Sequence, residues 1–228
     1  MSKPRLSGIA AFCCALPLLM VATPTMQARE AALMDGNAAL NRLMSGNQAY
    51  TQAEVSASRK IAKRRAKVAE GQRPFAVVVA CSDSRVSPEI VFDQSLGDLF
   101  VVRLAGNVVD DYALGSIEYA VEHLGARLVV VMGHARCGAV DAALQGVEAE
   151  GHVREIIRAI APAVKEAKHQ PGDPLVNATR NNAARVARGI ARSKPSLASY
   201  AGGEPVSVVA AYYHLDSGKI ELIDPKGR

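Results

Sequence analysis

The chain has 228 residues, of which 49% are hydrophobic and 21% are charged. This length and composition suit one ordinary domain with a sizeable core, which excludes a wholly disordered protein. The net charge is only +5 and tryptophan is absent, so the sequence lacks the strongly basic, aromatic surface that is typical of nucleic-acid binding. We therefore expect no nucleic acid among the partners of this protein.

The first 28 residues have the pattern of a signal peptide. Lys3 and Arg5 precede an uncharged apolar stretch over residues 9–22, and a segment of small residues ends at Ala28. The apolar stretch is shorter than the roughly 20 residues that a spanning helix needs. We predict cleavage after Ala28, export to the periplasm of a Gram-negative source, and no membrane attachment afterwards. An uncleaved membrane anchor is the alternative.

Cleavage changes the charge and the cysteine content of the chain. The mature chain keeps 25 basic and 22 acidic residues, a net charge of 25 minus 22, or +3. It loses Cys13 and Cys14 and keeps only Cys81 and Cys137. Two remaining cysteines in an exported protein suggest, by default, one disulfide.

From residue 29 onward, apolar runs alternate with amphipathic segments, which indicates a single α/β domain over residues 29–228. Apolar residues at helical spacing predict an N-terminal helical arm that ends where Ser-Gly-Asn breaks the pattern, at residues 45–47. A basic run over residues 59–67 follows. We interpret this run as the solvated face of a helix rather than as a site for an anionic partner.

Three short apolar runs predict strands, at residues 75–80, 99–104 and 128–132. The first and the third are rich in valine and apolar throughout, which is typical of parallel strands buried on both faces. Between the second and third runs, an apolar stripe over residues 114–124 predicts a helix that packs on the sheet.

The last third of the chain completes the predicted fold. Residues 152–168 and 175–192 have helical patterns, and residues 206–223 predict a hairpin that turns at Asp-Ser-Gly, residues 216–218. Four arginines of the second helix are expected to point outward: Arg180, Arg185, Arg188 and Arg192. The predicted fold is therefore α/β, with a mostly parallel central β-sheet flanked by helices, an N-terminal helical arm and a C-terminal hairpin.

Two of the predicted strands are followed by residues that can bind metals. Cys-Ser-Asp-Ser-Arg, residues 81–85, follows the first strand, and Gly-His-Ala-Arg-Cys, residues 133–137, follows the third. In open parallel sheets, ligands and catalytic groups collect at the carboxyl ends of the strands. We expect the two segments to meet there.

Cys81, His134 and Cys137 form a candidate zinc site. Two thiolates and one imidazole are a ligand set that suits zinc, and three protein ligands leave a fourth position for water, as in catalytic sites. A structural site would close its coordination sphere with a fourth protein ligand. A disulfide between the two cysteines, with His134 as an ordinary polar group, is the alternative.

Asp83 and Arg85 form a candidate catalytic pair. The guanidinium can hold the carboxylate by two hydrogen bonds and keep it ionised, so that Asp83 acts as an acceptor beside the metal. Two other roles remain open for Asp83: fourth zinc ligand, or cap of a helix that begins near residues 87–89.

Residues 81–85 and 133–137 resemble the zinc-site motifs of the β-class carbonic anhydrases, here of an exported bacterial type. The likeness continues through Gly-Asp-Leu-Phe-Val-Val-Arg at 97–103, Ala-Gly-Asn at 105–107 and Ile-Glu-Tyr-Ala at 117–120. The resemblance implies reversible hydration of carbon dioxide to bicarbonate and a proton by a zinc-bound hydroxide. It implies one zinc ion (Zn2+) per chain on Cys81, His134 and Cys137, and Asp83 with Arg85 as the catalytic dyad.

The resemblance also implies a substrate pocket at a dimer interface, and therefore a homodimer or a multiple of dimers. It assigns four residues to substrate binding: Gln72 as a hydrogen-bond donor, Phe100 and Tyr119 as apolar walls, and Gly106. His123 matches a position where many relatives have histidine, and a proton shuttle is one interpretation. A solvent-facing helix residue is the other.

Two positions depart from the family pattern. Leu104 stands where plant-like relatives have asparagine, and Val78 stands where bicarbonate-inhibited relatives have tryptophan. The absence of that indole predicts that Asp83 stays off the zinc ion near neutral pH. Two other functions remain as alternatives: hydrolysis of carbonyl sulfide or carbon disulfide by the same site, and a binding module in which zinc is only structural.

Overall fold

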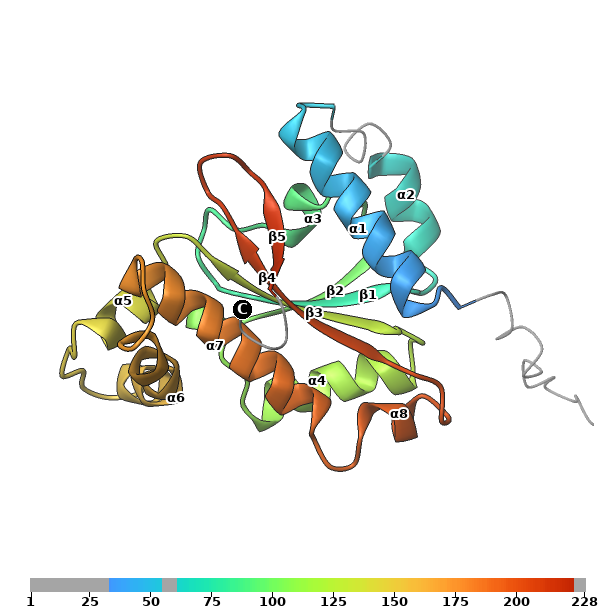
Figure 1. Ribbon diagram of the computed structural model, residues 1–228. Coiled ribbons are helices and arrows are strands. Elements are labelled where there is room, and N and C mark those ends of the chain that lie inside the picture. The colour runs from blue at the N-terminus through green and yellow to red at the C-terminus, as the bar shows by residue number, and fades with distance from the viewer. Residues whose placement is uncertain (1–32, 55–60, 224–228) are drawn as a thin grey trace, which may run out of the picture. The chain divides into compact units, whose positions relative to one another are not determined.

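The computed structural model describes residues 33–54 and 61–223, so the predicted signal peptide lies outside the described residues. A five-stranded sheet forms the centre, in the order β2-β1-β3-β4-β5 (Figure 1). The strands are β1 (Ala76–Ala80), β2 (Leu99–Arg103), β3 (Leu128–His134), β4 (Ser207–Tyr213) and β5 (Ile220–Ile223). The first four are parallel, and β5 returns antiparallel to β4. The mostly parallel sheet and the C-terminal hairpin are therefore confirmed.

Helices cover both faces of this sheet (Figure 1). On one face lie α1 (Gly36–Thr51), α2 (Ile61–Val68) and α3 (Pro88–Val91). On the other face lie α4 (Asp111–Glu122), α7 (Pro174–Ala191) and α8 (Leu197–Tyr200). A 3-10 turn, η3 (Ala105–Asn107), follows β2, and α5 (Gly138–Leu144) and α6 (Val153–Ala167) pack against α7 beyond one end of the sheet. Within the described ranges, no helix is long and apolar enough to cross a membrane.

Strand β1 shows why the apolar runs are continuous. Its five residues are all fully buried, because successive side chains alternate between two packed faces. Val77 and Val79 enter the core under α4 and α7, whereas Val78 enters the core under α1 and α3. Both faces exclude water, so a polar side chain at any position of β1 would be buried and would cost stability unless it found a hydrogen-bond partner.

The predicted end of the first helix at residues 45–47 is wrong, because α1 continues to Thr51. Gly46 allows a close contact: a Cβ atom there would lie 1.8 Å from the carbonyl oxygen of Phe92. Asn47 is buried, donates to the carbonyls of Val91 (3.1 Å) and Gly218 (2.8 Å), and accepts from the Ile220 N–H (2.9 Å). Both residues serve tertiary contacts, which override their weak helix propensity.

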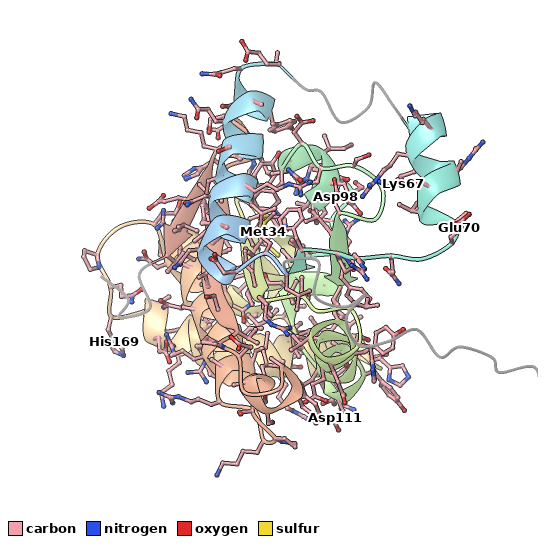
Figure 2. The ribbon with its side chains drawn as sticks, turned by 90° about the vertical axis from the view of Figure 1, so that its right-hand side faces the viewer. Met34, Lys67, Glu70, Asp98, Asp111 and His169 are labelled. Atoms are coloured by element: carbon pink, nitrogen blue, oxygen red, sulfur yellow. The ribbon has the colours of Figure 1, made fainter. Side chains whose placement is uncertain are left out.

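The basic run is only partly a solvated face. Lys63, Arg65 and Lys67 of α2 are exposed, as expected, but Arg64 binds Asp98 at 2.7 Å. Arg42 of α1 binds the other oxygen of Asp98 at 3.0 Å. Asp98 therefore lies between the two helices and joins both to the loop before β2 (Figure 2).

Arg180 also differs from its predicted outward position. It forms two hydrogen bonds with Glu221 of β5, and its guanidinium lies 4.9 Å from the centre of the Tyr212 ring. Arg185 pairs with Glu166 of α6. These arginines hold α7 against its neighbours instead of extending into solvent.

Replacement of Asn47 by leucine should destabilise the fold by about 3 kcal/mol, because two buried carbonyls and one buried N–H lose their partner. Urea unfolding measures the change. Asn41→Leu, at an exposed position of the same helix, is the matched control and should stay within about 0.5 kcal/mol of the parent chain. Equal stability of the two variants would contradict the role given to Asn47.

Candidate active site

The three predicted metal ligands meet at the carboxyl end of the sheet. Cys81 directly follows β1, His134 ends β3, and Cys137 precedes the first turn of α5. Because β1 and β3 are parallel neighbours, with Ala80 opposite Met132, their carboxyl ends lie side by side. The two sulfur atoms and the imidazole nitrogen lie within 4.8 Å of one another, and all three residues are buried.

The state of His134 fits a metal ligand. Its Nδ1 lies 2.9 Å from the carbonyl oxygen of Ala135, and because a carbonyl only accepts, Nδ1 carries the proton. Nε2 therefore keeps its lone pair, and this atom is fully buried without a hydrogen-bond partner. A buried acceptor without a partner is costly unless a ligand binds it. Together with two thiols, it forms the two-sulfur, one-nitrogen donor set that zinc favours.

Cys81 and Cys137 are free thiols, so the alternative of a disulfide is not adopted. The hydrogen bond from the Cys137 thiol lowers the pKa of Cys81, and the Gly106 N–H acts in the same direction. The same thiol-to-thiol hydrogen bond, together with burial, raises the pKa of Cys137. One thiolate is therefore favoured even before a cation enters, and a cation would favour two.

Asp83 and Arg85 form the predicted pair at the mouth of the cluster. Arg85 donates from Nε to Oδ1 at 2.9 Å and from Nη2 to Oδ2 at 2.7 Å, and its backbone N–H also bonds Oδ1 at 3.0 Å. These bonds hold the pKa of Asp83 well below its usual range. Asp83 Oδ2 lies 3.9 Å from His134 Nε2, so an ionised acceptor stands next to the cluster.

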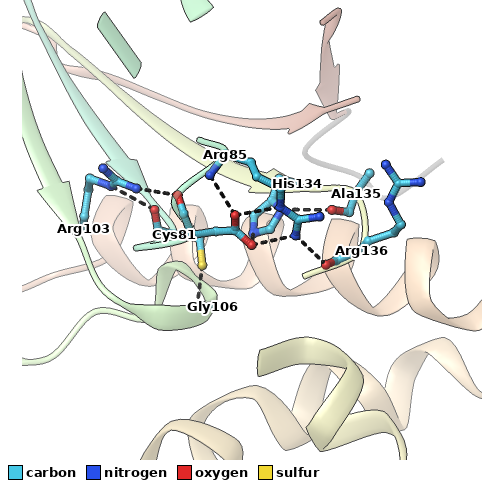
Figure 3. Close-up of polar contacts among 8 residues, drawn as sticks. Cys81, Arg85, Arg103, Gly106, His134, Ala135 and Arg136 are labelled. Carbon is cyan, nitrogen blue, oxygen red and sulfur yellow. Dashed lines mark hydrogen bonds and ion pairs between the residues drawn. The ribbon is translucent and has the colours of Figure 1, made fainter. Parts of the chain in front are cut away.

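The alternative role of Asp83 as a helix cap is not adopted. The N-cap residue of α3 is Ser87, and within the described part of the chain the carboxylate of Asp83 accepts hydrogen bonds only from the Arg85 side chain and backbone. Arg85 also donates to the carbonyl oxygen of Arg136 at 3.3 Å, between His134 and Cys137 in the chain. Arg85 thus links the two ligand-bearing segments (Figure 3).

Arg103 has a role that the sequence did not reveal. At the end of β2, it donates from Nε to the Cys81 carbonyl at 3.0 Å and from Nη2 to the Asp83 carbonyl at 2.6 Å (Figure 3). The residue stands in a matched motif, but a motif does not say which backbone atoms a side chain binds. Arg103 fixes the path of the segment that carries both a ligand and the acceptor.

Gly106 is the one predicted pocket residue that contacts the cluster in the same chain. Its N–H donates to the Cys81 sulfur at 3.2 Å, and its φ of 66° lies in the left-handed region that favours glycine. A Cβ atom would lie 2.6 Å from Ile160 Cδ1. Any other residue at this position would strain the backbone and force the Ile160 side chain to move.

Phe100 and Tyr119 lie away from the cluster within one chain. Phe100 pairs with Val77 in the sheet, four residues before Cys81, which is about 13 Å along a strand. The Tyr119 ring is 6.4 Å from the Phe100 ring, and Tyr119 is 47% exposed. These two apolar side chains form a separate, partly exposed group beside α4 and β2.

Gln72 and His123 also lie outside the cluster. Gln72 is exposed and precedes the amino end of β1, whereas Cys81 follows the carboxyl end. His123 ends α4, and its ring is 5.0 Å from that of Tyr119. The pocket and shuttle roles of these residues stay predictions, because one chain does not bring them to the metal ligands.

The sequence is similar to those of known carbonic anhydrases. The sequence model of a family described as carbonic anhydrase matches residues 76–220. Carbonic anhydrase 2 of Mycobacterium tuberculosis is 41% identical over 196 residues, covering 83% of this chain and 94% of that protein. The carbonic anhydrase of Mycolicibacterium smegmatis is 39% identical over 206 residues, covering 84% of this chain and 90% of that protein.

Solved structures agree with the fold. A β-carbonic anhydrase of Coccomyxa superposes with a TM-score of 0.63 at 27% identity, covering 80% of this chain and 85% of that one. The β-carbonic anhydrase CcaA superposes with a TM-score of 0.63 at 25% identity, covering 81% and 95%. On the sequence match, the shared sheet and the Cys-His-Cys cluster, this chain belongs to the carbonic anhydrase family and has the β-class fold.

Proposed function

We propose that this protein catalyses the reversible hydration of carbon dioxide to bicarbonate and a proton, with one zinc ion held by Cys81, His134 and Cys137. One observation carries the proposal: a buried set of two thiols and an imidazole lone pair lies beside a carboxylate that an arginine keeps ionised. A structural metal site has no use for that carboxylate. Family membership supports the choice of reaction.

Zinc supplies a Lewis acid at this point, which makes a hydroxide nucleophile available near neutral pH. The chain supplies orientation. Asp83, held ionised by Arg85, accepts a hydrogen bond from the attacking oxygen and so directs its lone pair toward carbon dioxide. Because Arg85 bonds both carboxylate oxygens, Asp83 is held back from serving as a fourth metal ligand. The valine at position 78, where bicarbonate-inhibited relatives have tryptophan, predicts the same.

We further propose that the active unit is a homodimer or a multiple of dimers, in which the pocket is completed by the partner. The support is the distance, within one chain, between the Cys-His-Cys cluster and the predicted pocket residues. The cluster lies at the carboxyl end of β1, whereas Gln72, Phe100 and Tyr119 lie toward its amino end. Carbon dioxide is small and apolar, and two aromatic walls with one amide donor suit it. A second copy of the chain can bring this group to the cluster.

Export is proposed on the N-terminal pattern alone. The basic start, the short apolar stretch and the small residues before Arg29 support cleavage after Ala28 and a periplasmic location. N-terminal sequencing of protein from the periplasmic fraction should begin at Arg29. Recovery of the chain with Met1 in the cytosolic fraction would contradict export.

Replacement of Asp83 by alanine should lower kcat/KM for carbon dioxide hydration by about 100-fold or more, because the oriented acceptor is lost. Zinc content should stay at one ion per chain, since Asp83 is not a ligand. Stopped-flow hydration and metal analysis on the same sample measure both. Glu89→Ala, which removes an exposed carboxylate on α3, is the control and should keep full activity. Loss of zinc in Asp83→Ala would show that the carboxylate binds the metal instead.

Two inactive variants should complement each other if the pocket spans two chains. Co-expression of Asp83→Ala with Gln72→Ala should restore about a quarter of the native activity, because half of the dimers are mixed and each has one intact site. Isolated mixed dimers should have half. Mixed dimers without activity would show that Gln72 and Asp83 act in the same chain.

Removal of zinc should make the two cysteines sensitive to oxidation. In the metal-free protein, hydrogen peroxide should take one hydrogen from each thiol, join Cys81 to Cys137, and be reduced to water. Intact mass and peptide mapping without reductant detect the bond, and Cys137→Ser is the control. Formation of the same disulfide in zinc-loaded protein would show that the thiolates are not coordinated.

A further inference from the structure

The turn after β2 has an unusual backbone. Gly106 and Asn107 are consecutive and both adopt left-handed conformations, with φ values of 66° and 45°. Asparagine adopts this conformation more readily than other non-glycine residues, but the conformation still costs energy and persists where the surroundings hold it. What holds this turn therefore decides where the Gly106 N–H points.

The N–H group of Gly106 is engaged with the metal site. It donates to the sulfur of Cys81 at 3.2 Å, so the direction of this N–H affects where that ligand atom sits. Hydrogen bonds to a metal ligand orient it and adjust its affinity for the ion. Any residue that fixes Gly106 thus acts on the metal site from outside it.

The carbonyl group of Gly106 is engaged from a different element. Asn182, in the middle of α7, donates from Nδ2 to this oxygen at 2.7 Å. Asn182 is only 2% exposed and lies on a helix face that otherwise buries small residues. A buried amide among alanines costs stability unless it forms hydrogen bonds. The amide of Asn182 finds its partner in the carbonyl of this turn.

We propose that Asn182 is a positioning residue for the zinc site, acting through Gly106 on the sulfur of Cys81. The amide of α7 holds the Gly106 carbonyl, which restricts rotation about the two free dihedral angles of that glycine. The N–H of the same residue then stays directed at the sulfur. Asn182 is not one of the three ligand residues, and the inference rests on the zinc site proposed above.

Zinc affinity tests the proposal. Asn182→Leu removes the donor at similar volume and should raise the dissociation constant for zinc, measured by competition with a chromophoric chelator, by 10- to 100-fold. Asn181→Leu is the matched control: this neighbouring amide binds Gln170 and the Ala163 carbonyl, not the turn. It should stay within about threefold of the parent chain, because Asn181 bonds neither a metal ligand nor the turn that holds one.

Cobalt substitution gives a second readout that a general loss of stability would not produce. The thiolate-to-metal charge-transfer bands should shift in Asn182→Leu and remain unchanged in Asn181→Leu. If the parent chain binds no zinc, the proposed function fails. If the parent binds zinc and folded Asn182→Leu binds it equally well with unchanged bands, only the role of Asn182 is overturned.

Two measurements cover the case in which leucine prevents folding. Asn182→Asp preserves the side-chain shape and replaces the donating amide with an acceptor, and it should also weaken zinc binding. In the unmodified chain, the side-chain amide protons of Asn182 should shift and exchange more slowly on zinc loading, while those of Asn181 do not. Unchanged Asn182 signals on zinc loading would overturn the proposal.

Discussion

The parallel pairing of β1 with β3 is the constraint on which the site depends. Its register sets Ala80 opposite Met132, so Cys81 and His134 leave the sheet side by side. A slip of one residue would turn each strand's side chains to the opposite face. The alternating side chains of both strands pack in two different cores, so a slip would place each side chain in the core of the opposite layer. The hydrophobic core therefore determines the distance between the metal ligands.

Most of the fold followed from local patterns in the sequence. Valine-rich runs identified β1 and β3, and the Asp-Ser-Gly turn placed the hairpin of β4 and β5. The prediction failed at Gly46 and Asn47, where residues that normally end a helix instead make contacts with Phe92 and with the hairpin. Such contacts join positions far apart in the chain, and no local pattern carries them. The path of Arg180 toward Glu221 was missed for the same reason.

The residues of the candidate site also differ in whether the sequence could predict them. Cys81, His134, Cys137, Asp83 and Arg85 were predictable, because strand ends of a parallel sheet converge and the chemistry of these residue types is specific. Arg103 and Asn182 were not, since each acts on a backbone atom of a distant segment. A polar residue on the small-residue face of α7 was the available signal for Asn182. Gln72, Phe100 and Tyr119, which we propose as pocket residues, lie toward the other end of β1, and their proposed role needs a second chain, which one sequence does not describe.

The burial of the cluster has a kinetic consequence. Cys137 is at once a candidate ligand and the cap residue of α5, and it is 1% exposed. Because this side chain is anchored at the start of α5, its release from a bound ion requires the first turn of α5 to move. Local opening of a helix end is governed by the stability of that segment rather than by the strength of each bond to the ion. The packing of α5 against α6 would therefore contribute to the lifetime of a bound metal.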